Sequence, residues 1–180
     1  MQRCSYPERL CQSHAVPRAG VESADLELPP FQELLDAYGQ DVHRFLRSLV
    51  GQDADDCYQE TWIAALRAYP RLRDASNLRG WILTVAHRKA IDRIRARRRE
   101  PVPAQSLPER GALDGDLEPA DEGLWAAVAE LPDKQRTAVT LRYLIDAGYE
   151  EVATVMGTSE DAARRSVHEG LKRLRREYAR

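Results

Sequence analysis

Hydrophobic positions recur along this chain at helical spacing, and no stretch of any length shows the two-residue alternation of a strand. In residues 31–50 the apolar side chains fall on one stripe: Leu34, Leu35, Tyr38, Val42, Phe45, Leu46 and Leu49. This pattern predicts an amphipathic helix, which Gly51 is expected to stop.

Two more helices are expected before residue 100. The first spans residues 53–69 and begins in the acidic stretch DADD, whose charges suit the positive end of a helix dipole. Its predicted buried face carries Tyr58, Trp62, Leu66 and Tyr69. The second spans residues 78–98, after the polar loop PRLRDASN, with a predicted buried stripe of Leu83, Ala86, Ala90, Ile91 and Ile94.

The C-terminal third of the chain predicts shorter helices. We expect one helix over residues 124–131 and another from Pro132 to about residue 144. Residues 149–177 then have the pattern of a helix-turn-helix, with Gly157 in the turn and Thr158 or Ser159 as the cap of the second helix. That helix has an apolar face of Ala163, Val167, Leu171 and Leu174, and its opposite face is cationic.

The fold class predicted from these patterns is all-α, with two small helical domains joined by a flexible linker. Residues 1–29 lack a helical period and are expected to form a disordered tail. The first domain is predicted over residues 30–100, the linker over 101–123 and the second domain over 124–180.

Charge is segregated along the chain, although the formal net charge is only −2. Residues 88–99 hold seven Lys or Arg and one acid, residues 164–180 hold seven Lys or Arg and two acids, and residues 100–123 hold seven acids and one Arg. Two basic blocks separated by an acidic connector indicate two modules that meet one extended polyanion such as nucleic acid. The alternative is a pair of solvated helix faces with a solubilising linker.

The composition argues against several other classes of protein. The three cysteines are widely spaced, which favours a reducing compartment, and we expect no metal and no cofactor, with Cys4, Cys11 and His14 the one conceivable ligand set. No stretch approaches the roughly 18 to 20 apolar residues of a membrane span, and the N-terminus lacks the apolar core of a secretory signal. Four scattered histidines and the lack of a phosphate-binding or zinc-protease motif predict no enzyme activity.

Two stretches carry a family resemblance. DADDCYQETWIAALRAYPRL…NLRGWILTVAHRKAIDRIRARRR resembles the second conserved region of bacterial sigma factors, and LPDKQRTAVTLRYLIDAGYEEVATVMGTSEDAARRSVHEGLKRLRRE resembles their fourth region. With only a short linker between them, the chain is similar to the compact extracytoplasmic-function (ECF) type. The resemblance implies a cytoplasmic bacterial sigma factor that binds core RNA polymerase and promoter DNA, directs transcription initiation and is held inactive by an anti-sigma factor.

The resemblance also implies site residues. In the second expected helix, Asp56, Gln59, Glu60 and Ile63 share a face that would dock on the clamp coiled coil of the largest polymerase subunit; the alternative is an ordinary solvated acidic face. Contacts to the −10 promoter element would come from Ser76, Asn77, Arg79, His87, Arg88, Arg93 and Arg95. Contacts to the −35 element would come from Thr158, Ser159, Arg164, Arg165, His168 and Lys172.

Some features leave alternatives open. Trp81 is expected in the core rather than as a platform for a base, and Thr84 and Arg88 stand where relatives often have an arginine and an asparagine, which leaves the promoter preference open. A stand-alone helix-turn-helix regulator would explain the C-terminal module but would leave the Asp56–Ile63 face and the first basic block without a function. A sigma-like decoy that binds polymerase or an inhibitor without initiating is a third possibility.

Overall fold

The computed structural model describes residues 28–99 and 122–178, and within these ranges the regular structure is entirely helical, as predicted. Most of the predicted tail and most of the predicted linker lie outside the described residues. The elements are α1 (Phe31–Val50), η2 (Gly51–Asp53), α2 (Ala54–Ala68), η3 (Tyr69–Arg71), α3 (Leu78–Arg99), α4 (Glu122–Ala129), α5 (Asp133–Tyr143), α6 (Tyr149–Met156) and α7 (Glu160–Tyr178).

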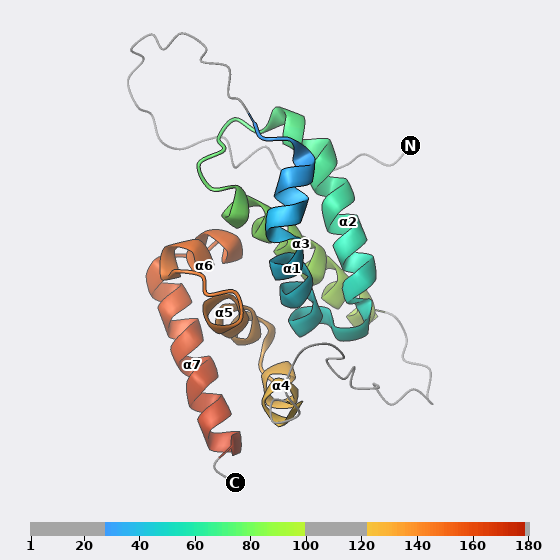
Figure 1. The fold of residues 1–180 in the computed structure, drawn as a ribbon. Coiled ribbons are helices and arrows are strands. Elements are labelled where there is room, and N and C mark those ends of the chain that lie inside the picture. Colours follow the sequence, from blue (N-terminus) through green and yellow to red (C-terminus); the bar gives the residue numbers. More distant parts are fainter. Residues whose placement is uncertain (1–27, 100–121, 179–180) are drawn as a thin grey trace.

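Helices α1, α2 and α3 pack against one another in an N-terminal bundle (Figure 1). Its core contains the predicted stripe of α1, with Val42, Phe45 and Leu46 fully buried. Gly51 ends α1 with a positive φ of 61°, a conformation that costs a glycine little. Trp81 is half-buried and its ring centroid lies 6.0 Å from that of Tyr69, in agreement with its expected place in the core.

The predicted buried face of α2 is wrong at one position. Leu66 is 55% exposed, and the fully buried side chain at this level of the helix is that of Ala65. The helix turns its small residues inward, and the hydroxyl of the buried Thr61 donates to the Cys57 carbonyl at 2.7 Å. Because neighbouring residues project about 100° apart, a core centred on small side chains leaves Leu66 in solvent.

Helices α4 to α7 form a C-terminal bundle (Figure 1). Gly157 adopts the left-handed conformation in the turn between α6 and α7, as the pattern predicted. The Ser159 hydroxyl accepts a hydrogen bond from the Ala162 amide at 3.3 Å, so Ser159 rather than Thr158 caps α7. Ala163, Val167 and Leu174 are buried on the predicted apolar face of α7.

The two bundles pack directly on each other. Helix α6 lies against α3, and α5 lies against α1. Buried side chains of both bundles belong to one continuous hydrophobic cluster, which includes Phe45 and Leu83 from the first and Leu141 from the second. The Ser48 hydroxyl also donates across the boundary to the Thr140 hydroxyl at 3.0 Å. The sequence predicted two domains but not this contact between them.

Candidate functional site

One side of α2 presents a mixed polar and apolar surface. Asp56, Gln59, Glu60 and Ile63 are all exposed, as the sequence predicted, and Ile63 is 50% exposed. Leu66 follows Gln59 by seven residues and Ile63 by three, so it projects from the same side. We call these five residues the α2 face. Leu66 was missed because it was assigned to the core, although its spacing from Ile63 is the signal that could have identified it.

The α2 face is tied to α3 at one edge. Lys89 Nζ lies 3.1 Å from Glu60 Oε2. This pair is exposed, and exposed ion pairs contribute little to stability. Glu60 can therefore exchange Lys89 for another partner at small cost.

The basic block at the end of α3 is partly neutralised by Asp53 of η2, the residue just before α2. Arg93 Nη2 lies 2.8 Å from Asp53 Oδ1, and Arg97 Nη1 lies 3.7 Å from Asp53 Oδ2. The hydrogen bond from Arg93 lowers the pKa of the Asp53 carboxyl, against the opposing effect of its burial. Arg88 and Arg95 are exposed. Three of the predicted phosphate contacts, Arg88, Arg93 and Arg95, therefore reach solvent along one helix.

The loop before α3 has a structural role at its last residue. Asn77 Oδ1 accepts a hydrogen bond from the Gly80 amide at 2.7 Å, which makes Asn77 the cap of α3. A Cβ on residue 80 would lie 2.6 Å from Asn77 Nδ2, so the glycine leaves room for this cap. Asp74 Oδ1 accepts from the Ser76 amide at 2.8 Å, and this bond lowers the pKa of Asp74. Ser76 and Asn77 remain exposed, on a loop held in shape by these two bonds.

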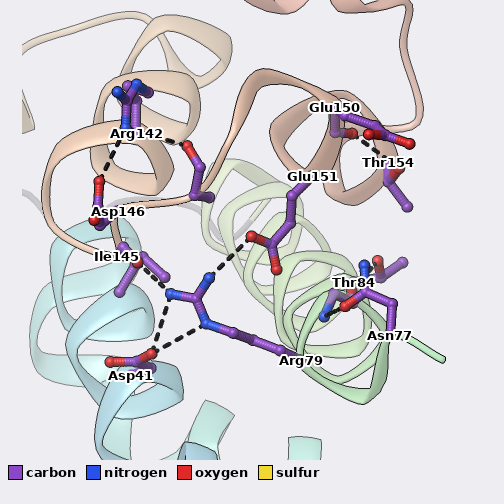
Figure 2. A network of polar contacts seen from close by, with 12 residues as sticks. Asp41, Asn77, Arg79, Thr84, Arg142, Ile145, Asp146, Glu150, Glu151 and Thr154 are labelled. Atoms are coloured by element: carbon purple, nitrogen blue, oxygen red, sulfur yellow. Dashed lines mark hydrogen bonds and ion pairs between the residues drawn. The ribbon is translucent and has the colours of Figure 1, made fainter. Parts of the chain in front are cut away.

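Arg79 and His87 differ from the other predicted −10 residues because they face the C-terminal bundle. Arg79 Nη1 lies 2.9 Å from Glu151 Oε2, and Arg79 Nη2 lies 3.3 Å from Asp41 Oδ2 and donates to the Ile145 carbonyl (Figure 2). His87 is half-buried, and this burial lowers the pKa of its imidazole.

The outer side of α7 carries exposed cations. Arg164, Arg165, His168 and Lys172 are all exposed, and Thr158 and Ser159 are exposed just before the helix. The Arg164 guanidinium bonds to Glu160 and lies 4.8 Å from the centroid of the Tyr149 ring. This aromatic contact holds the side chain over the first helix of the helix-turn-helix.

Within residues 28–99 and 122–178, no group of three or more His, Cys, Asp or Glu side chains is placed to hold a metal ion. Cys4, Cys11 and His14 lie outside the described residues. Among the described helices, none is long and apolar enough to cross a membrane.

Comparison with known proteins decides the family. Residues 34–100 match the family model described as Sigma-70 region 2, and residues 121–174 match that described as Sigma-70, region 4. The ECF RNA polymerase sigma factor SigM of Bacillus subtilis is 31% identical over 157 residues, which cover 82% of this chain and 94% of the relative. This chain belongs to the ECF sigma factors. SigD of Mycobacterium tuberculosis, an ECF RNA polymerase sigma factor, is 30% identical over 185 residues, covering 95% of this chain and 87% of that relative.

The fold agrees with this membership. The sigma factor RpoE of Bartonella quintana, solved in complex with the anti-sigma factor NepR, superposes with a TM-score of 0.68 at 23% identity, over 81% of this chain and 94% of that one. The protein is therefore an alternative sigma factor that directs transcription initiation, and the predicted all-α, two-domain fold is confirmed. The stand-alone regulator is not favoured, because it leaves the region 2 match unexplained.

Proposed function

We propose that this sigma factor docks on the clamp coiled coil of core RNA polymerase through the α2 face, and that α3 and α7 then contact the −10 and −35 promoter elements. The exposure of Ile63 and Leu66, at 50% and 55%, is the observation that carries the docking proposal. Two large apolar side chains one turn apart are costly to leave in water unless a partner covers them.

The polar members of the α2 face suit the edge of such an interface. Specific interfaces place apolar side chains at the centre and polar side chains at the rim, where hydrogen bonds fix the orientation of the partner. Here Ile63 and Leu66 supply the apolar centre, and Asp56, Gln59 and Glu60 supply the rim. The opposite side of α2 is fully occupied by the core, so the docking role needs no rearrangement within the helix.

For the −10 element we propose two kinds of contact. The exposed Arg88, Arg93 and Arg95 bind backbone phosphates, a salt-sensitive and largely sequence-independent interaction. Ser76 and Asn77 lie on the loop before α3, where their hydroxyl and amide groups can hydrogen-bond an unstacked base. Arg79 and His87 join this surface only when the C-terminal bundle moves away from α3.

For the −35 element we propose that α7 enters the major groove with Arg164, Arg165, His168 and Lys172 outward. A bidentate contact between an arginine and a guanine contributes about 1 to 3 kcal/mol of discrimination between bases. Thr158 and Ser159 stand at the start of α7, where a phosphate would meet the positive end of the helix dipole.

The proposal extends to activity, location and regulation. Because the polymerase carries out nucleotide polymerisation, the sigma factor has no enzyme activity of its own. It acts where the polymerase does, in the bacterial cytoplasm. The complex of RpoE with NepR supports an anti-sigma factor as a further partner of this chain. Pull-downs from the native cell that recover no inhibitor under any growth condition would contradict that part.

Co-elution with sigma-free core polymerase tests the docking proposal. The informative variants are Ile63→Asp and Leu66→Asp, and the matched control is Ala37→Asp, which adds the same carboxylate at an exposed position of α1. Loss of a central interface residue costs about 2 kcal/mol or more, so each α2 variant should bind roughly 30-fold more weakly than the control. Unchanged binding of both variants would exclude the α2 face as the docking surface. A native chain that ignores polymerase but shifts duplex DNA would restore the stand-alone regulator.

A further inference from the structure

A cluster of four residues joins the two bundles at the first turn of α3. We call Asp41 of α1, Arg79 of α3, Ile145 after α5 and Glu151 of α6 the Arg79 cluster (Figure 2). The guanidinium donates to two carboxylates and one carbonyl from three other parts of the chain. One side chain therefore links both bundles by charge-assisted hydrogen bonds, which are stronger than neutral ones.

The cluster is better shielded than the ion pair between Arg98 of α3 and Asp133 of α5, which also joins the two bundles. The side chains of Arg79 and Glu151 are 27% and 17% exposed, whereas Arg98, which pairs with Asp133 at 2.9 Å, is 66% exposed. Shielding from water strengthens the attraction and reduces its screening by salt. The Arg79 cluster is therefore a stronger candidate than the Arg98–Asp133 pair for a contact that keeps the bundles together.

The same contact is incompatible with DNA at the start of α3. A guanidinium that donates to Asp41, Glu151 and Ile145 has little donor capacity left for a phosphate. The two carboxylates would also repel a phosphate that approached this turn, and α6 packs against the same helix. Arg79 is hence available either to the C-terminal bundle or to nucleic acid, but not to both.

We propose that the Arg79 cluster is an intramolecular lock: it holds the C-terminal bundle over part of the −10 surface in the free chain. Opening frees Arg79 and exposes His87. The reference to DNA rests on the proposed function, whereas the contact between the bundles does not. A phosphate can take the place of Glu151 and the Ile145 carbonyl as a partner of Arg79, while Asp41 of the same bundle stays in contact, so the lock exchanges ligands when promoter DNA binds.

The test uses Glu151→Gln, which removes the charge on α6 that meets Arg79. The matched control is Glu150→Gln, which makes the same change in net charge in the same first turn of α6, at an exposed residue. Opening is measured by a thiol probe on Thr140→Cys, because Thr140 is 1% exposed and its hydroxyl meets Ser48 across the boundary. The other cysteines are Cys57, kept as an internal control, and the two in the tail, replaced by serine.

The amide oxygen of Gln can still accept from Arg79, but a charge-assisted hydrogen bond is roughly twice as strong as a neutral one, so Glu151→Gln should raise the rate of labelling at residue 140 by roughly threefold to tenfold. Glu150→Gln should leave this rate close to that of the parent chain. Equal rates in the two variants would overturn the lock. A parallel rise in the labelling of buried Cys57 would also overturn it, because that result means unfolding rather than separation of the bundles.

The second readout is fluorescence anisotropy with a labelled single-stranded oligonucleotide and the free chain. Glu151→Gln should bind it several-fold more tightly than Glu150→Gln, since the two variants differ only in the release of Arg79. If residue 140 opens but no variant binds DNA more tightly, the exclusion of DNA by the lock is wrong while the contact between bundles stands. Failure of polymerase co-elution would instead count against the proposed function, independently of both readouts.

A disulfide provides a second variant in case Glu151→Gln does not fold. Ser48→Cys with Thr140→Cys places two thiols where the hydroxyl oxygens are 3.0 Å apart, close enough for a bridge after a small adjustment. The oxidised chain should bind the oligonucleotide several-fold more weakly than the same chain after reduction. Equal binding before and after reduction would overturn the lock.

Discussion

The close contact between α5 and α7 makes the effect of one added methyl group calculable. Gly170 of α7 faces α5, and a Cβ at this position would lie 2.6 Å from Val139 Cγ2 and 3.5 Å from Gln135 Cβ. Val139 is 5% exposed and belongs to the apolar cluster between α4, α5 and α7. A valine in a helix has essentially one favoured rotamer, so this methyl group cannot swing away.

Two opposing terms set the size of the effect of Gly170→Ala. Replacing a helix-interior glycine by alanine stabilises the helix by about 1 kcal/mol. Overpacking a tight core costs about 1 to 3 kcal/mol, and the rigid neighbour and 2.6 Å approach argue for the upper part of that range. We therefore expect a net destabilisation of about 1 to 2 kcal/mol.

Val139→Ala removes the methyl group that the new Cβ would meet. Alone it should destabilise the bundle by about 2 kcal/mol through lost burial and a small cavity. In the double variant the alanine at 170 fills part of that space, so its destabilisation should be at least about 1 kcal/mol less than the sum of the single changes.

Urea unfolding followed through tryptophan fluorescence measures this cycle. Trp125 packs against the same cluster, and the contribution of Trp62 and Trp81 is common to all the variants. Gly39→Ala is the control: its Cβ would lie 2.9 Å from Tyr58 Oη, the outer end of a half-buried side chain, and it should cost less. Additivity within about 0.3 kcal/mol would refute the argument, since it would mean that residues 139 and 170 do not compete for space.

Three further predictions concern single side chains. The hydrogen bond from Arg93 lowers the folded-state pKa of Asp53 below its usual 3.8, so the charged carboxylate stabilises the fold above pH 3.8, and this stabilisation is lost as the pH falls through the folded-state pKa. In urea unfolding, Asp53→Asn should therefore reduce stability more at pH 7 than at acidic pH, and an equal loss at both would contradict this. Burial raises the pKa of Cys57 to about 11, so at pH 8 about a thousandth of this thiol is in the thiolate form. A thiol reagent should therefore label Cys57 only after denaturant is added, and rapid labelling of the native chain would contradict this. Asn77→Ala removes the cap bond to the Gly80 amide and should cost about 1 kcal/mol in thermal unfolding, whereas Asn77→Asp should retain most of the stability.

Short-range pattern was enough to predict most of the fold. The helices, the turn at Gly157 and the apolar faces of α1 and α7 depend on residues three or four positions apart, and all of them were confirmed. Leu66 shows where this reasoning fails. Periodicity identifies a hydrophobic stripe, but the structure buried Ala65 and Thr61 in its place because small side chains let the helices of the bundle approach closely.

The exposure of the candidate surfaces was predicted more successfully than the local role of their side chains. The exposure of Asp56, Gln59, Glu60 and Ile63 and of the cations on α7 follows from helical geometry together with the family resemblance, whereas Leu66 of the α2 face was missed. Asn77 was selected only as a polar residue that could meet DNA, and the structure shows that it also caps α3, whereas Ser159 was already a candidate cap in the sequence and the structure confirms that role. Local composition does not distinguish a capping side chain from a ligand-binding one when both need an exposed hydrogen-bonding group.

The sequence by itself determined the elements, the two sigma-like motifs and the two basic blocks, because each depends on residues close together in the chain. Only the tertiary structure decided which of the cationic side chains are paired with carboxylates of the same chain. In the sequence Arg79 is one more arginine of a basic helix, but in the structure its partners include Glu151, which lies 72 positions later. Whether a cation faces solvent or the other bundle depends on how two helical bundles pack, and that packing depends on shape and burial summed over many residues.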